Sequence, residues 1–303
     1  MATTQQIDED TTRELVLSDG RTLAYSIYGD QSSSRVAFYF HGFPASRLEA
    51  SLWDSAAASL SVRIIAPDRP GMGKSTLQPN RTILGWAKDV LELANHLEIK
   101  EFSIIALSGG SPYAFACAKE IPKSQLKNVT IVSGAYPLSY GTAGMMFSAK
   151  TLLFVASWLP WFVGTMMDWA LGMAARDTDH PEIFDQRILK EMETRPEPDR
   201  RCLEDESFKN NFLASVREAF RSSAHGAAWE ARLLGTVWGF ELEDVCVDRT
   251  LLWHGKEDVN CPVAMAEKAE KSIPGARLLK FDGEAHISIL VNYMGKIIEG
   301  AFT

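Results

Sequence analysis

Hydrophobic and polar positions follow two alternating patterns through the first part of the chain. Short apolar runs typical of buried strands alternate with longer segments in which apolar residues recur at helical spacing, and polar turns rich in Gly, Pro and Asp separate them. The predicted strands cover residues 14–17, 23–28, 35–40, 62–66, 102–107 and 129–132, and the predicted helices cover 47–60, 83–97 and 111–120. This alternation predicts a mostly parallel sheet, and the turn Ser18-Asp19-Gly20 adds an antiparallel pair of strands at its beginning.

The pattern changes after Ser133. Residues 135–235 contain many helical runs, no convincing strand and an abundance of Met and Trp. The strand and helix pattern then returns, with predicted strands at 249–253 and 276–281 and predicted helices at 262–273 and 287–302. We therefore expect an α/β domain formed by residues 1–134 and 236–303, interrupted by a helical insertion at residues 135–235.

Composition narrows the class of protein and the compartment. Of the 303 residues 46% are hydrophobic, so the chain can bury a large core. The net charge of −8 does not favour nucleic acid, because that binding depends on cations that neutralise phosphates. Met1–Asp10 lacks the features of a secretory signal, and the four cysteines are scattered. We expect a cytoplasmic protein with free thiols, and the sequence leaves its oligomeric state open, a homodimer included.

One segment of the insertion, residues 151–167, carries no charged side chain. It is shorter than the roughly 20 residues that a membrane-spanning helix needs, and Pro160 interrupts it. No transmembrane segment is therefore expected. A peripheral contact with a membrane is the alternative, but an apolar lining for a pocket under the insertion is favoured.

The stretch Ile105–Pro112 places Ser108 between a predicted strand and a predicted helix. Ala106 and Gly110, two positions away on either side, are small. Small residues at these positions permit the sharp and strained turn of a nucleophile elbow. An ordinary glycine-rich turn is the simpler interpretation of this stretch taken alone.

A nucleophilic serine needs a base and a group that orients the base. In sheets of this kind, reactive residues follow the carboxyl ends of strands. Glu257 and Asp258 follow the strand at 249–253, and His286 follows the strand at 276–281. The order Ser108, Asp258, His286 is the chain order of a hydrolase triad. We expect His41 and His254 to be structural.

No cluster of His, Cys or Asp has the spacing of metal ligands, so we expect no metal. The loop Gly71–Ser75 resembles parts of a phosphate loop and of a dinucleotide fingerprint. Asp68 and Thr76 stand where those two motifs require glycine. We therefore expect no cofactor.

Five segments together resemble the α/β-hydrolase superfamily, and the resemblance covers nearly the whole chain outside the insertion. The segments are His41-Gly42-Phe43-Pro44-Ala45-Ser46-Arg47, Asp68-Arg69-Pro70-Gly71-Met72-Gly73-Lys74-Ser75, Ser108-Gly109-Gly110-Ser111-Pro112-Tyr113, His254-Gly255-Lys256-Glu257-Asp258 and Gly283-Glu284-Ala285-His286. Ala106 and Ser111 stand where the family usually has glycine. Both substitutes are small, so the elbow turn survives.

The resemblance implies an α/β-hydrolase fold, with an eight-stranded, mostly parallel sheet covered by helices on both faces and a helical cap at residues 135–235. It also implies roles for five residues. Ser108 would be the nucleophile and His286 the base, and Asp258, rather than Glu257, would orient His286. The backbone N–H groups of Phe43 and Gly109 would form the oxyanion hole.

Substrate contacts are expected from residues near the elbow and from apolar residues of the insertion: Leu107, Ser111, Met145, Met146, Trp158 and Trp161. The favoured function is a serine hydrolase that cleaves an ester, thioester or lactone of a medium-sized apolar small molecule. The first alternative uses the same residues for carbon–carbon hydrolysis, or for a cyclase or lyase reaction of secondary metabolism. The second alternative is a ligand-binding protein without catalysis, because a fold alone does not fix function.

Overall fold

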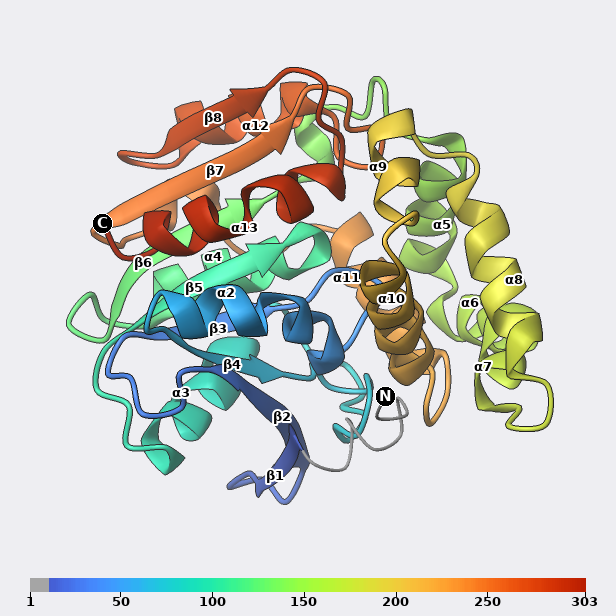
Figure 1. Ribbon diagram of the computed structural model, residues 1–303, viewed down its shortest axis with the longest axis horizontal. Coiled ribbons are helices and arrows are strands. Elements are labelled where there is room, and N and C mark those ends of the chain that lie inside the picture. The colour runs from blue at the N-terminus through green and yellow to red at the C-terminus, as the bar shows by residue number, and fades with distance from the viewer. Residues whose placement is uncertain (1–10) are drawn as a thin grey trace.

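The computed structural model describes residues 11–303, so the segment Met1–Asp10, in which the sequence shows no secretory signal, lies outside the described residues. Within the described chain, eight strands form one sheet in the order β1-β2-β4-β3-β5-β6-β7-β8 (Figure 1). The strands are β1 Thr12–Val16, β2 Thr22–Gly29, β3 Val36–Phe40, β4 Arg63–Pro67, β5 Phe102–Leu107, β6 Leu126–Val132, β7 Arg249–Gly255 and β8 Arg277–Phe281. The pairs β1–β2 and β2–β4 are antiparallel and the others are parallel. The predicted mostly parallel sheet is confirmed.

The central strands are apolar throughout because both faces of the sheet are covered. On β3, Phe40 packs edge-on against Trp86 on one face, with ring centroids 5.7 Å apart. Its neighbour Tyr39 packs against Trp53 on the opposite face, at 5.3 Å. Successive side chains of a strand point to opposite faces, so a strand buried on both sides reads as a continuous apolar run.

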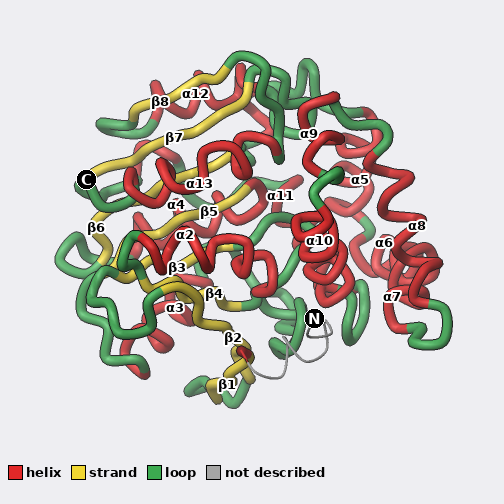
Figure 2. The backbone as a smooth tube through the Cα atoms, viewed as in Figure 1, coloured by secondary structure: helices red, strands yellow, loops and turns green. Residues whose placement is uncertain are grey.

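Helices of the α/β domain cover both faces of the sheet (Figure 2). They are α2 Asp54–Ser59, α3 Trp86–His96, α4 Ser111–Glu120, α12 Val263–Ser272 and α13 Ser288–Gly300. The predicted helix at residues 47–60 is α-helical only from Asp54 onward, because the segment η1, Arg47–Trp53, is a 3₁₀ helix. Tight 3₁₀ turns are common where an α-helix begins.

Residues 135–235 contain helices and no strand within the described structure, as the sequence pattern predicts. The helices are α5 Phe147–Trp158, α6 Pro160–Met167, α7 Met173–Arg176, α8 Pro181–Met192, α9 Glu197–Cys202, α10 Glu206–Ala219 and α11 His225–Gly235. Figure 1 shows α5 to α10 beyond the arrowheads of β5 and β7, at the carboxyl edge of the sheet. This edge is where the predicted reactive residues lie.

Buried ion pairs join two helices of this insertion to loops of the sheet. The guanidinium of Arg47 lies 2.6 Å from Asp68 and 2.7 Å from Glu218 of α10. Glu230 of α11 accepts from the guanidinium of Arg69, and one of its oxygens lies 2.9 Å from Arg81. Removing one partner of such a pair leaves an uncompensated buried charge. These pairs connect α10 and α11 to the segments that follow β3 and β4.

Candidate active site

Ser108 occupies the turn between β5 and α4, in the left-handed backbone region at a φ of 48°. A residue other than glycine is strained there and is held by its surroundings. The neighbouring glycine is required by space, because a Cβ on Gly110 would come within 2.4 Å of the carbonyl oxygen of Phe40. Pro112 lies in the first turn of α4, where its missing N–H leaves no bond unmade. The turn thus holds the side chain of Ser108 at the carboxyl edge of the sheet.

Two loops bring His286 and Asp258 to this serine. His286 Nε2 lies 2.9 Å from Ser108 Oγ, and His286 Nδ1 lies 2.8 Å from Asp258 Oδ2. The second carboxylate oxygen of Asp258 accepts the backbone N–H groups of Asn260 and Cys261, both at 2.8 Å. Glu257, its neighbour in the same loop, is exposed. The structure therefore brings Ser108, His286 and Asp258 into one hydrogen-bonded series and leaves Glu257 outside it.

Asp258 and His286 shift each other's pKa, so that each favours the charged form of the other. Burial alone would raise the pKa of Asp258, but the charge of His286 and hydrogen bonds from His286 and His254 hold it well below its ordinary value. Burial alone would lower the pKa of His286, but Asp258 raises it above its ordinary value. Asp258 is therefore ionised at neutral pH, and its charge stabilises a proton on His286.

A second histidine, His254, lies beside Asp258, and its contacts agree with the structural role expected from the sequence. It is buried, and its Nε2 lies 2.6 Å from the carbonyl oxygen of Cys261 and 3.4 Å from Asp258 Oδ2. A carbonyl oxygen can only accept, so this contact assigns the proton to Nε2. His254 thereby braces the loop that carries Asp258.

The loop after β3 carries Phe43 and is anchored from two sides. The guanidinium of Arg69 donates to the carbonyl oxygens of His41 and Gly42 at 2.6 and 2.8 Å. The N–H of Gly42 donates to the buried carboxylate of Glu49 at 2.8 Å. Gly109 lies against this loop, since a Cβ added to it would come within 3.5 Å of the nitrogen of Phe43. Phe43 and Gly109 therefore lie next to each other at the turn that carries Ser108.

A cavity of about 240 Å³ adjoins Ser108 between the insertion and the sheet. Phe43 and Gly109 also line it. Its remaining wall is largely apolar, with the side chains of Leu138, Met145, Leu152, Leu153, Leu234 and Met265. The side chain of Ser108, hydrogen-bonded to His286, is thus next to a largely apolar cavity.

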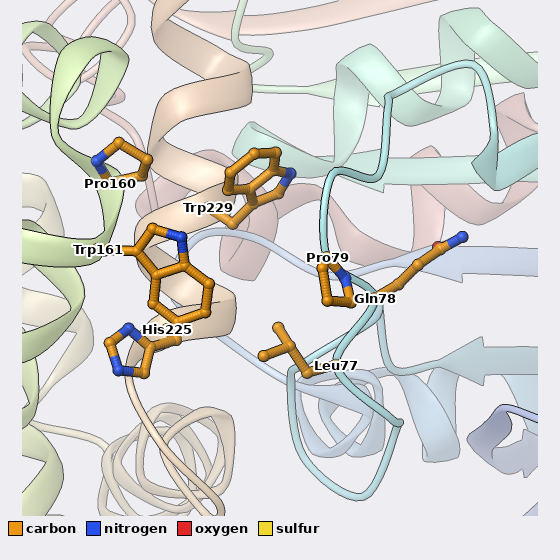
Figure 3. A pocket seen from close by; sticks show the side chains of 7 residues that line it. All are labelled: Leu77, Gln78, Pro79, Pro160, Trp161, His225 and Trp229. Atoms are coloured by element: carbon orange, nitrogen blue, oxygen red, sulfur yellow. The ribbon is translucent and has the colours of Figure 1, made fainter.

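The two tryptophans predicted to contact substrate do not line this cavity. Trp158 is 75% exposed and Trp161 is 56% exposed. Trp161 packs against His225, with ring centroids 4.6 Å apart, in a separate small pocket that Trp229 also lines (Figure 3). The prediction that these tryptophans line a pocket near Ser108 is therefore wrong.

The arrangement of α5 explains why Trp158 lies outside the cavity. Its residues Ala149, Leu152 and Leu153 turn toward the cavity. Phe147, Phe154 and Trp158, spaced by whole helical turns, lie on the opposite face and are exposed. Both faces are apolar, so the sequence pattern could not show which one turns inward.

Of the four other predicted contacts, Met145 lines the cavity and three residues do not. Leu107 is buried in the core of the sheet. The hydroxyl of Ser111 lies 2.7 Å from the carbonyl oxygens of both Ser108 and Ala135 and can donate its one proton to either, so it stabilises the beginning of α4. Met146 contacts the guanidinium of Arg195 through its sulfur.

The chain is similar to known proteins of one fold family. A model of the alpha/beta hydrolase fold matches residues 38–293. The chain belongs to the α/β-hydrolase fold family. At this level the chain is a hydrolase of the α/β-hydrolase fold.

Individual relatives are distant. The hydrolase YcgS of Bacillus subtilis (strain 168) is 28% identical over 110 residues, and this match spans 36% of the present chain and only 37% of YcgS. Among solved structures, an esterase from Exiguobacterium antarcticum aligns over 95% of this chain and 96% of its own, with 20% identity and a TM-score of 0.66. The enol-lactonase from Burkholderia xenovorans LB400 aligns over 95% and 97%, with 17% identity and the same TM-score. At such identities the two structures show the common fold alone.

One residue of this α/β-hydrolase site was missed in the sequence. Asp199 of α9 is 1% exposed and accepts the backbone N–H groups of His286, Ile287 and Ser288 at 3.2, 2.7 and 3.0 Å. It thereby caps the beginning of α13 beside the histidine. Burial raises the pKa of Asp199, although these donors and the charge of His286 act against the rise. No motif marks Asp199, because its partners lie 87 or more residues away.

The described part of the chain holds no group of three or more His, Cys, Asp or Glu side chains arranged for a metal ion. Over residues 11–303, every helix is too short or too polar to cross a membrane.

Proposed function

We propose that the protein is a serine hydrolase that cleaves an ester, thioester or lactone bond of a medium-sized apolar molecule through an acyl-enzyme. The observation that carries the proposal is the series from Ser108 Oγ to His286 Nε2 at 2.9 Å and from His286 Nδ1 to Asp258 at 2.8 Å. Serine is a poor nucleophile unless a positioned base removes its proton, and this series supplies the base and its orienting acid.

The reaction begins with attack of Ser108 Oγ on the carbonyl carbon while the hydroxyl proton moves to His286 Nε2. Negative charge then gathers on the former carbonyl oxygen, and the N–H groups of Phe43 and Gly109 stabilise it. When the tetrahedral state collapses, the bond to the leaving group breaks and the proton on His286 passes to the leaving oxygen or sulfur. The products of this half of the cycle are an acyl-serine and an alcohol or thiol, and with a lactone the new hydroxyl group stays on the acyl chain.

Water completes the cycle by the same steps. His286 Nε2 accepts a proton from the water as its oxygen attacks the acyl carbon, and the proton returns to Ser108 Oγ as the acid leaves. Asp258 keeps the proton of neutral His286 on Nδ1 and stabilises the imidazolium that forms. Its lowered pKa supports this role, because an ionised Asp258 is needed throughout the cycle.

The cavity supports an apolar substrate of moderate size. Ligand pockets of this kind are mostly apolar with a few placed polar groups, and this chamber of about 240 Å³ follows that composition. We propose that residues 135–235 act as the cap that closes it, since α5, α8 and α11 all contribute to its wall. A cytoplasmic location stays a prediction.

Covalent labelling tests the function. A fluorophosphonate probe at low dose should modify Ser108 and no other serine, and Ser108→Ala should fold normally and lose both labelling and hydrolysis of p-nitrophenyl esters. An adduct on Ser111 or Ser133 would refute the assignment. Labelling of Ser108 without turnover of esters or lactones would favour carbon–carbon hydrolysis, and absence of both would favour a ligand-binding protein.

A further inference from the structure

A single cationic side chain lines the cavity that contains Ser108. Arg195 follows α8 in the insertion, and no other Lys or Arg is among the residues that line this cavity. Its side chain is only 17% exposed, so most of it is removed from water. The wall around it is largely apolar, with Glu191 as the one acidic residue that also lines the cavity, and a cation there calls for an anionic or strongly accepting partner.

The partners present in the protein do not neutralise this charge fully. One terminal nitrogen of Arg195 donates to the side-chain oxygen of Asn260, which is neutral. The other lies 3.4 Å from Glu191, whose side chain is 54% exposed, and ion pairs with a water-exposed partner are weak. Nε of Arg195 is buried and has no hydrogen-bond partner among residues 11–303. A buried donor without a partner is costly, so the protein alone does not satisfy every donor of this guanidinium.

The position of Arg195 also relates it to the reaction. Asn260, to which it donates, follows Asp258 in the acid loop. Its positive charge acts on His286 and opposes the charges of Asp258 and Asp199 there. A substrate group bound by Arg195 would therefore lie within the same chamber as the bond that Ser108 attacks.

We propose that Arg195 binds a carboxylate carried by the substrate, so that the substrate class is an ester or lactone with an apolar body and an anionic end. The guanidinium is planar and offers paired donors that match a carboxylate. The inference rests on the proposed function of this cavity and names the substrate class that the cavity selects.

Binding to the Ser108→Ala variant tests the inference without requiring turnover. Calorimetric titration would compare mono-p-nitrophenyl glutarate with p-nitrophenyl pentanoate, which has the same acyl length without the carboxylate. A second pair, 4-carboxyphenyl pentanoate and phenyl pentanoate, places the carboxylate on the leaving group instead. We expect one of the two anionic probes to bind about 10- to 100-fold more tightly than its neutral partner, as charge-assisted hydrogen bonds suggest. The favoured pair tells which side of the scissile bond faces Arg195.

Adding Arg195→Gln should abolish that preference and leave the affinity for the neutral probes within about twofold. Arg200→Gln is the matched control, because Arg200 is exposed on α9 and does not line the cavity. Equal affinity for anionic and neutral probes in both pairs, or a preference that survives Arg195→Gln, would overturn the proposal. Failure of wild-type protein to hydrolyse p-nitrophenyl pentanoate would instead count against the proposed function, whatever the binding results.

Discussion

Asp199 accepts a hydrogen bond from the backbone N–H of His286 at 3.2 Å, although 87 positions separate the two residues in sequence. The carboxylate comes from the helical insertion and the histidine from the last loop of the α/β domain. The insertion therefore does more than form one wall of the cavity. It also holds the loop that carries His286, and the charge of Asp199 acts on that histidine.

Replacing Asp199 with Asn should shift the pH dependence of the enzyme. Burial alone would lower the pKa of His286, while the charges of Asp258 and Asp199 raise it and that of Arg195 lowers it. The variant keeps one amide oxygen that can still accept from the N–H groups of Ile287 and Ser288, and it loses the charge and the acceptor for the N–H of His286. The pKa of His286 should fall, and the acid limb of kcat/KM should move to lower pH.

A pH profile of kcat/KM for a p-nitrophenyl ester measures this shift. Glu197→Gln is the control, because Glu197 is an exposed carboxylate on the same helix. An acid limb that stays where it is in Asp199→Asn, or moves to higher pH, would contradict the electrostatic role of Asp199.

Asp258→Asn should lower kcat by about 10³- to 10⁴-fold, because the amide favours the wrong tautomer of His286 and leaves Ser108 without a base. Glu257→Gln should change kcat little, since Glu257 is exposed and lies outside the hydrogen-bonded series. Steady-state kinetics on one ester substrate compares the two variants. Similar losses in both would refute the assignment of Asp258.

Glu230→Gln should destabilise the fold by about 3–5 kcal/mol, because it leaves the buried guanidinium groups of Arg69 and Arg81 without their counter-ion. Arg69 also holds the carbonyl oxygens of His41 and Gly42, so hydrolysis should weaken even at temperatures where the variant is folded. Urea unfolding gives the free energy of unfolding. Glu182 pairs with His180 at the surface and provides the control. Glu182→Gln should lower the free energy of unfolding by less than about 1 kcal/mol. Equal stabilities for the two variants would contradict the buried role of Glu230.

The two faces of α5 should have different effects on substrate preference. Leu152→Ala removes apolar surface from the cavity, so kcat/KM for long acyl chains should fall about 5- to 30-fold relative to short chains, at roughly 0.8 kcal/mol for each buried CH₂. Trp158→Ala should leave the dependence on chain length unchanged, because Trp158 lies on the exposed face. A series of p-nitrophenyl esters from acetate to decanoate measures both. A flattened dependence in Trp158→Ala would show that the exposed face reaches the substrate.

Much of this site follows from local sequence. Ser108 has small neighbours that its strained turn requires, and Asp258 and His286 each follow a strand that the apolar pattern predicts. Because parallel strands end at one edge of a sheet, residues just after strand ends converge there whatever lies between them in sequence. The sheet, the turn at Ser108 and the loops that carry Asp258 and His286 could therefore be predicted from the sequence.

Other features depended on packing between distant segments. Helix α5 is apolar on both faces, so only its contact with the α/β domain determined that Leu152 lines the cavity and Trp158 does not. Asp199 and Arg195 belong to no motif, and their roles arise from how α8 and α9 lie over the loops of His286 and Asp258. Local patterns specify the elements and the strand-end loops because those depend on backbone geometry and burial. The partner of each residue in the helical segment 135–235 is set by long-range contacts, which a single sequence does not encode in any short pattern.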